Sequence, residues 1–385
     1  MTITGSRASD LATRDGLSAL ERAKRQPLIL GLFLPIQNGG WTISSAARNT
    51  DWSFDYNAKL IVKAEEAGFD LAFGLAQWLG SEGHGGATKY RKFSIDPLLV
   101  TSGVAALTRN IMLISTVHVL YGWHPLHLAK LGATMDHMTG GRWGLNLVTG
   151  FRPNEIEMFG LDPIPRDERY VRAAEFTDIL DTLWRSEEDI SWEGDYWSLK
   201  SAYVSPKPVH GRPILVNAGS SKAGLAYAAK YSDLIFITSP GGAEISAALK
   251  TLPAHTAEIK ALAAEQGREI RTVINPHVIC RDTEREVDQV CKAILVGEDA
   301  PAVNSLVGTM RQGDQSSWRG HERRQRIIGG NVQIFGTPEQ VVEQFAALKD
   351  AGCDGLQINF FDFAPDLAYF AKNVLPLMKQ AGLRV

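Results

Sequence analysis

The amide of Asn146 stands within an otherwise apolar stretch, residues 143–148, and this combination points to ligand binding. Gly140-Gly141 and Arg142 precede the stretch and Thr149-Gly150 ends it, which is typical of a parallel strand buried on both faces. A buried amide is costly unless its hydrogen bonds are satisfied. We therefore expect Asn146 to face a ligand with polar edges; the alternative is an amide satisfied by neighbouring backbone.

A second polar segment, Ala218-Gly219-Ser220-Ser221, lies between a predicted strand and a predicted helix. The unpaired backbone amides and the positive end of a helix N-terminus bind anions such as phosphate. Gly219, Ser220 and Ser221 therefore form a candidate phosphate site, unless the segment is only a serine N-cap.

Hydrolytic and metal chemistry find no support in the sequence. It contains neither a Gly-x-Ser-x-Gly elbow nor a His-Glu-x-x-His helix. His118, His124 and His127 are close in sequence, but His118 is predicted on a strand and His127 on the following helix. Spacing alone does not bring three imidazoles together, so we predict no metal site.

The predicted loops are rich in aromatic residues. An apolar mouth with few polar groups and a phosphate site suits a bulky planar cofactor, although part of the aromatic set will be core. Four of these residues are candidate pocket residues: Trp41, Phe73, Trp78 and Phe151.

Eight buried strands alternate with helices along the chain, without a break in composition. The strands are predicted at 28–35, 69–75, 111–119, 143–148, 213–217, 233–237, 271–280 and 355–359. This alternation predicts a single α/β domain, a (β/α)8 TIM barrel over residues 27–385, in preference to an open doubly wound sheet. The active site of such a barrel lies at the carboxyl ends of the strands. This rule selects Gln77 with Ala76, Thr116 with His118, Asn146 with Glu155, and the Ser221 segment.

Two segments fall outside this alternation. Residues 1–26 are polar and charged, so we predict a flexible N-terminal arm. Residues 297–333 form an arginine-rich insertion before the last helix–strand unit. An insertion of this length is a lid, an oligomer contact or a solvated loop.

Charge and composition limit the classes of partner that the protein could bind. The 385-residue chain has a net charge of -3, which offers no platform for nucleic acid, and it has no apolar run long enough to span a membrane. Its three cysteines are far apart and suggest no disulfide framework. We expect a cytoplasmic enzyme whose partner is a small molecule.

Several segments resemble the bacterial-luciferase-like flavin oxidoreductases, in particular the two-component monooxygenases, over about residues 29–378. The most specific are FLPIQNGGW at 33–41, TMDHMTGGR at 134–142, NLVTG at 146–150, DERY at 167–170, SPKP at 205–208 and AGSS at 218–221. Together they look like the pyrimidine monooxygenase branch. TDWSFDYN at 50–57 looks more like the dimethylsulfone monooxygenases.

The resemblance implies a cofactor and roles for individual residues. The cofactor would be FMN in its reduced form, FMNH2, supplied by a separate NAD(P)H-dependent flavin reductase. Ala76 and Gln77 would line the isoalloxazine, and Asn146 would bond to its polar edge. The ribityl chain and phosphate would be held by Glu155, Arg169, Tyr170 and Ser221. A homodimer or homotetramer is implied as well.

The pyrimidine branch also suggests where oxygen reacts. A threonine and an asparagine in that branch are associated with a flavin peroxide at nitrogen 5 instead of carbon 4a, and Thr116 and Asn146 match both positions. Thr116 could instead be an ordinary β-branched strand residue. Phe151 stands where that branch has a tryptophan and Phe73 where it has a smaller aliphatic, which predicts a differently shaped pocket.

We therefore expect an FMNH2- and O2-dependent monooxygenase that acts on a small apolar organic substrate. Its flavin peroxide would attack an electrophilic carbon, and a C–N, C–S or C–halogen bond would break, with His118 as general acid or substrate anchor. Two alternatives are a deazaflavin-dependent dehydrogenase of the same barrel type and a flavin-binding protein without catalysis. The former needs more basic residues near the phosphate site than Lys222 alone.

Overall fold

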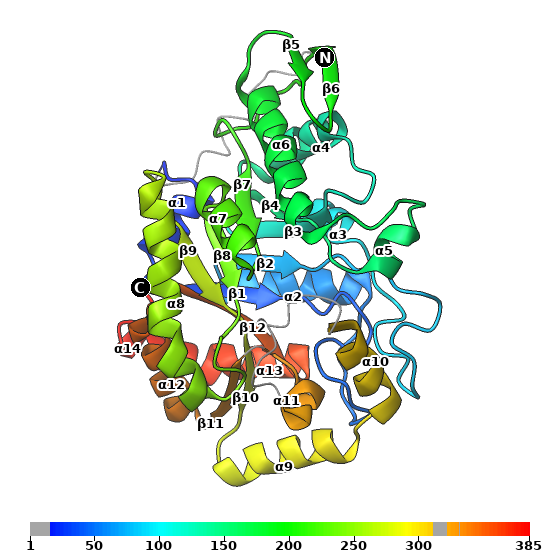
Figure 1. The fold of residues 1–385 in the computed structure, drawn as a ribbon. Coiled ribbons are helices and arrows are strands. Elements are labelled where there is room, and N and C mark those ends of the chain that lie inside the picture. The colour runs from blue at the N-terminus through cyan, green and yellow to red at the C-terminus, as the bar shows by residue number, and fades with distance from the viewer. Residues whose placement is uncertain (1–15, 311–321, 331) are drawn as a thin grey trace, which may run out of the picture.

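Eight parallel strands close into a barrel, which confirms the predicted fold (Figure 1). The computed structural model describes residues 16–310, 322–330 and 332–385. Neighbouring strands follow one another round the barrel, and β1 pairs with β12 to close it. The barrel strands are β1 (Ile29–Phe33), β2 (Leu71–Gly74), β3 (Met112–His118), β4 (Trp143–Val148), β7 (Ile214–Asn217), β8 (Leu234–Ile237), β9 (Arg271–Ile274) and β12 (Gly355–Phe360).

Helices pack around the outside of the barrel (Figure 1). The outer helices are α2 (Phe54–Glu66), α3 (Pro97–Val104), α4 (Pro125–Thr139), α6 (Arg166–Arg185), α7 (Lys222–Tyr231), α8 (Ile245–Glu265), α12 (Pro338–Asp350), α13 (Phe363–Asn373) and α14 (Leu375–Gln380). Those between strands return the chain to the amino-terminal end of the next strand, as parallel strands require, whereas α13 and α14 follow the last strand.

Alternate residues of each strand face the barrel interior or the helices. Ile114 of β3 packs in an interior cluster with Phe73 and Val216, whereas Leu145 of β4 packs in a cluster with the outer helices. Because side chains alternate along a strand, Thr116, two residues after Ile114, faces the interior. In β4 the outward-facing Leu145 leaves Asn146 facing the interior as well.

The prediction of a flexible arm over residues 1–26 is wrong for its last part. Ala19–Arg25 forms α1, which starts with a capping box between Ser18 and Glu21. Ala19 and Ala23 lie one turn apart and are buried in the barrel-interior cluster. Two alanines in a charged segment give too weak an apolar signal for this contact to be expected. Residues 1–15 lie outside the described part of the chain.

The 297–333 insertion contains regular structure in its described part. It includes α10 (Ala300–Met310) and α11 (Arg323–Ile328), and β11 (Val332–Gly336) begins at its end. Ile327 and Ile328 are buried in a cluster that also contains Ile43 and Phe361. The segment is therefore packed on the barrel, with residues 311–321 and 331 outside the description.

Of the remaining elements, the sequence predicted only the helix at 283–296, which is α9 in the structure. The predicted strand 271–280 divides at Asn275 into β9 and β10 (Pro276–Cys280), and β10 pairs with both β12 and β11. A two-stranded antiparallel hairpin joins β5 (Ile190–Glu193) to β6 (Ser198–Ala202), and α5 (Pro153–Glu157) and α9 (Glu284–Val296) complete the elements. Within the described residues, none of the helices has the length and apolarity needed to cross a membrane.

Candidate active site

Thr116 and Asn146 are direct neighbours inside the barrel. They are paired in register on β3 and β4, and Asn146 Nδ2 donates to Thr116 Oγ1 over 2.9 Å. Each side chain is 1% exposed. Asn146 Oδ1 is buried and accepts no hydrogen bond from the residues that the structure describes. Because the threonine oxygen accepts from the amide, its hydroxyl proton is left to donate elsewhere. The pair can therefore offer a ligand the Thr116 hydroxyl as a donor and Asn146 Oδ1 as an acceptor.

His118 follows on the same face of β3 and is neutral. Its ring stacks on Tyr121 with centroids 4.7 Å apart, and Nδ1 is buried without a partner in the described chain. Burial, assisted by the positive charge of Arg152, lowers the pKa of His118 to about 3. An imidazole that is neutral at pH 7 can accept or donate a hydrogen bond, but it is a poor general acid. Of the two predicted roles, the lowered pKa of His118 favours the anchor.

Glu155 lies on the short helix α5, which follows β4. It is 2% exposed and accepts from Tyr121 Oη over 3.0 Å and from Arg152 Nη1 over 2.6 Å. Burial and the Glu155 charge raise the pKa of Tyr121, so its hydroxyl stays protonated. Arg169 Nη1, from α6, donates to the carbonyl oxygen of Gly150 over 3.0 Å. Glu155, which the rule on strand ends had selected, and Arg169, which only the family resemblance had suggested, therefore both lie near the end of β4.

Ser221 is the N-cap of α7, and its hydroxyl accepts from the backbone amide of Gly224 over 3.2 Å. The backbone nearby lies close to Tyr170 of α6. A Cβ added at Gly219 would lie 2.5 Å from the Tyr170 hydroxyl oxygen, and one at Gly224 would lie 2.7 Å from it. The structure thus brings Tyr170 together with the Gly219-Ser220-Ser221 segment, which sequence spacing alone could not establish.

Gln77 and Ala76 lie beyond the end of β2. Ala76 is buried, and Gln77 Oε1 accepts from Arg91 Nη1 over 3.0 Å. Gln77 Nε2 is buried and has no acceptor in the part of the chain that is described. A donor of this kind is available to a ligand carbonyl.

The four predicted pocket aromatics occupy two levels. Phe73 is buried inside the barrel, with its ring centroid 4.5 Å from that of Phe236. Trp41 packs on Phe33 with centroids 3.7 Å apart. Trp78 and Phe151 are 38% and 42% exposed. Trp41 and Phe73 therefore form an apolar floor, whereas Trp78 and Phe151 belong to the outer rim.

The sequence analysis missed a second polar group inside the barrel, on β10 and β12. His277 Nδ1 and Asn359 Oδ1 are hydrogen-bonded, and the Asn275 amide donates to the carbonyl oxygen of Gln357 over 2.6 Å. Among the described atoms, Gln357 Nε2 and His277 Nε2 are buried and have no partner. The alternating Gln357-x-Asn359 pattern within an apolar strand was the available signal.

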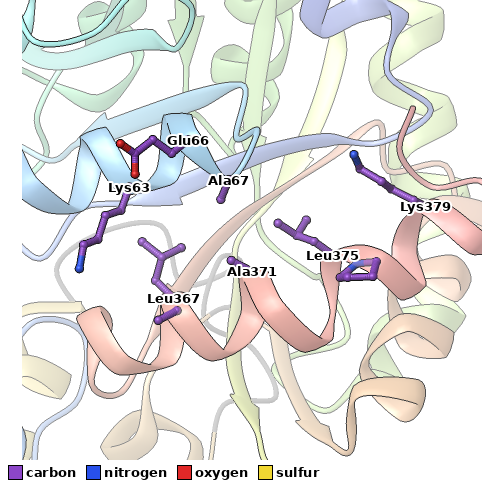
Figure 2. A pocket seen from close by; sticks show the side chains of 9 residues that line it. Lys63, Glu66, Ala67, Leu367, Ala371, Leu375 and Lys379 are labelled. Carbon is purple, nitrogen blue, oxygen red and sulfur yellow. The ribbon is translucent and has the colours of Figure 1, made fainter.

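Other features of the described residues do not compete for this role. No group of three or more His, Cys, Asp and Glu side chains in this part of the chain could hold a metal ion. A groove of about 610 Å³ lies on the outside of the barrel between α2 and α13–α14 (Figure 2). It is lined by Lys63 and Glu66 near the end of α2, before β2 begins, so it is remote from the carboxyl ends of the strands.

Fold and site together define a cofactor-binding TIM-barrel protein whose polar groups converge on the carboxyl ends of the strands. The chain belongs to the luciferase-like monooxygenase family, whose sequence profile matches residues 29–355.

Named relatives lie in the two branches that the sequence motifs indicated. The chain is 31% identical over 366 residues to an FMNH(2)-dependent dimethylsulfone monooxygenase of Pseudomonas fluorescens, covering 92% of this chain and 96% of that protein. It is 29% identical over 375 residues to the pyrimidine monooxygenase RutA of Bradyrhizobium sp. strain BTAi1, covering 92% and 98%. Its fold matches that of DmoA from Hyphomicrobium sulfonivorans with a TM-score of 0.80 and 18% identity, over 92% of this chain and 88% of that chain.

Proposed function

We propose that this protein is the oxygenase of a two-component system: it takes FMNH2 from a separate NAD(P)H-dependent flavin reductase and uses O2 to oxygenate a small organic substrate. The observation that carries the proposal is the buried Thr116–Asn146 pair, joined by a 2.9 Å hydrogen bond inside the barrel. Relatives named as FMNH(2)-dependent and pyrimidine monooxygenases support it.

The polar groups of the site fit the edges of an isoalloxazine, which carries both N–H donors and carbonyl acceptors. Asn146 Oδ1 would accept from a ring N–H, and Gln77 Nε2 would donate to a ring carbonyl, since both atoms are buried and lack partners in the described chain. Burial of such atoms is costly until a ligand satisfies them.

The phosphate end fits the start of α7. Ser221 and the adjoining backbone amides would hold the phosphate, with Tyr170 beside them, because a helix N-terminus offers N–H groups and a favourable dipole. Arg169 and Glu155 would hold the ribityl chain near the β4 exit.

Reduced FMN would supply the electrons that activate O2. The chain's contribution would be position and environment. Thr116 would direct its hydroxyl proton at the reacting oxygen, while Asn146 holds the threonine oxygen in place. Such hydrogen bonds are strong in a site that excludes water. The placement of this pair would decide whether oxygen reacts at nitrogen 5 or at carbon 4a of the ring.

The substrate would lie over the apolar floor formed by Trp41 and Phe73, with neutral His118 as a hydrogen-bonding anchor. Oxygenation at a carbon bonded to nitrogen, sulfur or halogen would lead to cleavage of that bond. Water exclusion by the aromatic residues would limit wasteful reaction with solvent.

An anaerobic titration with chemically reduced FMN tests the cofactor, with a reduced deazaflavin as the comparison. We expect tight binding of reduced FMN and weaker binding of the deazaflavin. Oxygen uptake with NADH, FMN and a flavin reductase, coupled to mass spectrometry across sulfones, N-heterocycles and haloaromatics, then tests oxygenation. Failure of reduced FMN to bind, or an oxygen uptake that no compound converts into an oxygenated product, would count against the proposal.

A further inference from the structure

Arg91 is a buried cation near the barrel mouth, in the segment between β2 and α3. Its side chain is 7% exposed. In the described chain, none of the ion pairs within 4.0 Å involves Arg91. A buried charge is normally paired, because its desolvation costs several kcal/mol, on the order of the whole margin of stability. Within residues 16–310, 322–330 and 332–385, Arg91 is therefore a buried cation without a counter-ion.

The guanidinium of Arg91 is held in a fixed orientation. It lies over the Trp41 ring at 4.7 Å and over the Tyr90 ring at 4.9 Å from the centroids. Its Nη1 donates to the neutral amide oxygen of Gln77 over 3.0 Å, and Nε is buried without an acceptor among the described atoms. The stacking and the amide bond position the group without neutralising it.

The backbone at Arg91 is strained. Its φ is +59°, in the left-handed region that residues with a Cβ seldom adopt. The Arg91 amide donates to the carbonyl oxygen of Asn38 over 3.0 Å, and the Asn38 side chain accepts from the Phe93 amide over 2.8 Å. Strain of this kind persists only where surrounding contacts impose it, which is common at ligand sites.

The surroundings of Arg91 add further positive charge. The ring of His84 lies 5.9 Å from that of Tyr90, over which Arg91 stacks, and burial with the charges of Arg91 and Arg152 lowers the pKa of His84 to about 3. Burial and, after it, the charge of Arg152 lower the pKa of His118 to about 3 as well. Glu155, the carboxylate nearby, is already paired with Arg152 over 2.6 Å. An anion at this place would meet an unpaired guanidinium.

Arg91 is also adjacent to the apolar floor of the site. Its stacking partner Trp41 contacts Phe33, and the ring centroids of Phe33 and Phe73 are 4.9 Å apart. The proposed phosphate site at Ser221 follows β7, which β3 and β4 separate from β2 in the strand order. The cation is therefore on the substrate side of the barrel mouth, away from the phosphate end.

We infer that Arg91 anchors an oxyanion carried by the substrate, a carboxylate or a sulfonate, while the apolar body of the substrate packs on Trp41 and Phe73. This inference rests on the proposed function, since it names the substrate class of that site. A guanidinium binds a carboxylate or sulfonate through two parallel N–H···O bonds. A neutral sulfone or haloaromatic would leave Arg91 uncompensated, so the preferred substrate is a small organic acid.

Binding of matched neutral and anionic probes to the FMN-loaded protein tests the inference. Benzoate and benzenesulfonate are the anionic probes, and benzamide and benzenesulfonamide are their neutral counterparts; each is titrated by calorimetry. Variants R91Q and R91K are compared with K92Q, which removes one positive charge from the next residue. Circular dichroism and the FMN dissociation constant check that each variant is folded and loaded.

In the wild type we expect each anion to bind roughly 10- to 100-fold more tightly than its neutral counterpart, the range for hydrogen bonds to a charged group. R91Q should abolish this preference, R91K should keep part of it, and K92Q should keep it in full. Arg91 Nη1 also donates to Gln77, a residue of the proposed flavin site, so R91Q is expected to weaken FMN binding modestly, and every variant is compared at saturating FMN.

Three results would overturn the inference: equal binding of anions and neutral probes to the wild type, an unchanged preference in R91Q, or an equal loss in K92Q. If R91Q instead weakened FMN binding and left the anion preference unchanged, Arg91 would belong to the flavin site and the inference would fall. Because the probes report binding alone, this outcome is separate from a failure of oxygenation.

Discussion

Replacing Thr116 with valine removes one hydroxyl group and keeps the shape of the side chain. In the wild type the Thr116 oxygen accepts from Asn146 Nδ2 over 2.9 Å, in a place where both side chains are 1% exposed. T116V therefore leaves a buried amide donor without its acceptor, which costs about 1–3 kcal/mol. With an unfolding entropy of about 2.1 cal/mol/K per residue, this corresponds to a Tm lower by roughly 1–4 °C.

The functional effect of T116V should exceed its effect on stability. The valine gives the reacting oxygen no hydroxyl proton and leaves the Asn146 amide free to rotate. We expect the rate at which bound reduced FMN reacts with O2, followed by rapid mixing, to change by roughly tenfold or more, the equivalent of one hydrogen bond to a charged group. The dissociation constant for reduced FMN should stay within about threefold, since other residues hold the ribityl chain and phosphate.

T116S is the matched control, because it keeps the hydroxyl and loses only a methyl group. It should retain a reaction with O2 close to that of the wild type. The reasoning is refuted if T116V and T116S react alike with O2, or if T116V loses FMN affinity while its rate with O2 is unchanged.

Three further changes give distinct outcomes. S221A should lower the free energy of unfolding by about 1 kcal/mol, because the N-cap of α7 is lost, and should weaken FMN binding by roughly tenfold, because the phosphate contact is lost as well. T283A removes the N-cap of α9; it should lower the free energy of unfolding by a similar amount and leave FMN affinity unchanged in the same titration. G219A places a Cβ 2.5 Å from a tyrosine hydroxyl and should lower both Tm and FMN affinity, whereas G80A, with nothing within 4 Å, should change neither. Burial lowers the pKa of His277 in the folded protein to about 4, below its value of about 6.5 in the unfolded chain. The contribution of neutral His277 to the free energy of unfolding is therefore complete above pH 6.5 and is lost as the pH falls toward 4. Urea unfolding between pH 4 and 7 should show a steeper loss in the wild type than in H277Q, by up to about 1.4 kcal/mol per pH unit; parallel curves would disprove this contribution.

Alternation within strands made the central pair predictable. The apolar run around Asn146 and the β-branched strand around Thr116 both indicated buried parallel strands, and the rule on strand ends placed both side chains in one region. Their hydrogen bond depends on the register between β3 and β4, which sequence spacing does not determine. The position of Tyr170 on α6 beside Gly219 and Gly224 likewise depends on tertiary packing.

Arg91 shows why other parts of the site escaped prediction. Nothing in the neighbouring sequence distinguishes Arg91 from the exposed Lys89. The contacts that single it out are with the Trp41 ring and the Gln77 amide, and Trp41 lies about 50 positions away in the chain. The α1 contact escaped for a related reason, since Ala19 and Ala23 bury little area each. The sequence shows Gln357 and Asn359 as polar residues within an apolar strand, but it does not show that His277 of β10 lies beside them.

The two edges of the barrel meet through residues separated by almost the whole sequence. β1 pairs with β12, and the buried guanidinium of Arg384 donates to the carbonyl oxygen of Leu28 over 2.8 Å and to Asp70 beside β2. A nascent polypeptide therefore leaves one edge of β1 unpaired until β12, which ends at Phe360, has been synthesised. Such edges recruit other extended chains, so slow translation or truncation before that residue should favour chaperone dependence and aggregation. Once β1 and β12 are paired and Arg384 has bound Leu28 and Asp70, the barrel has no free edge between these two strands.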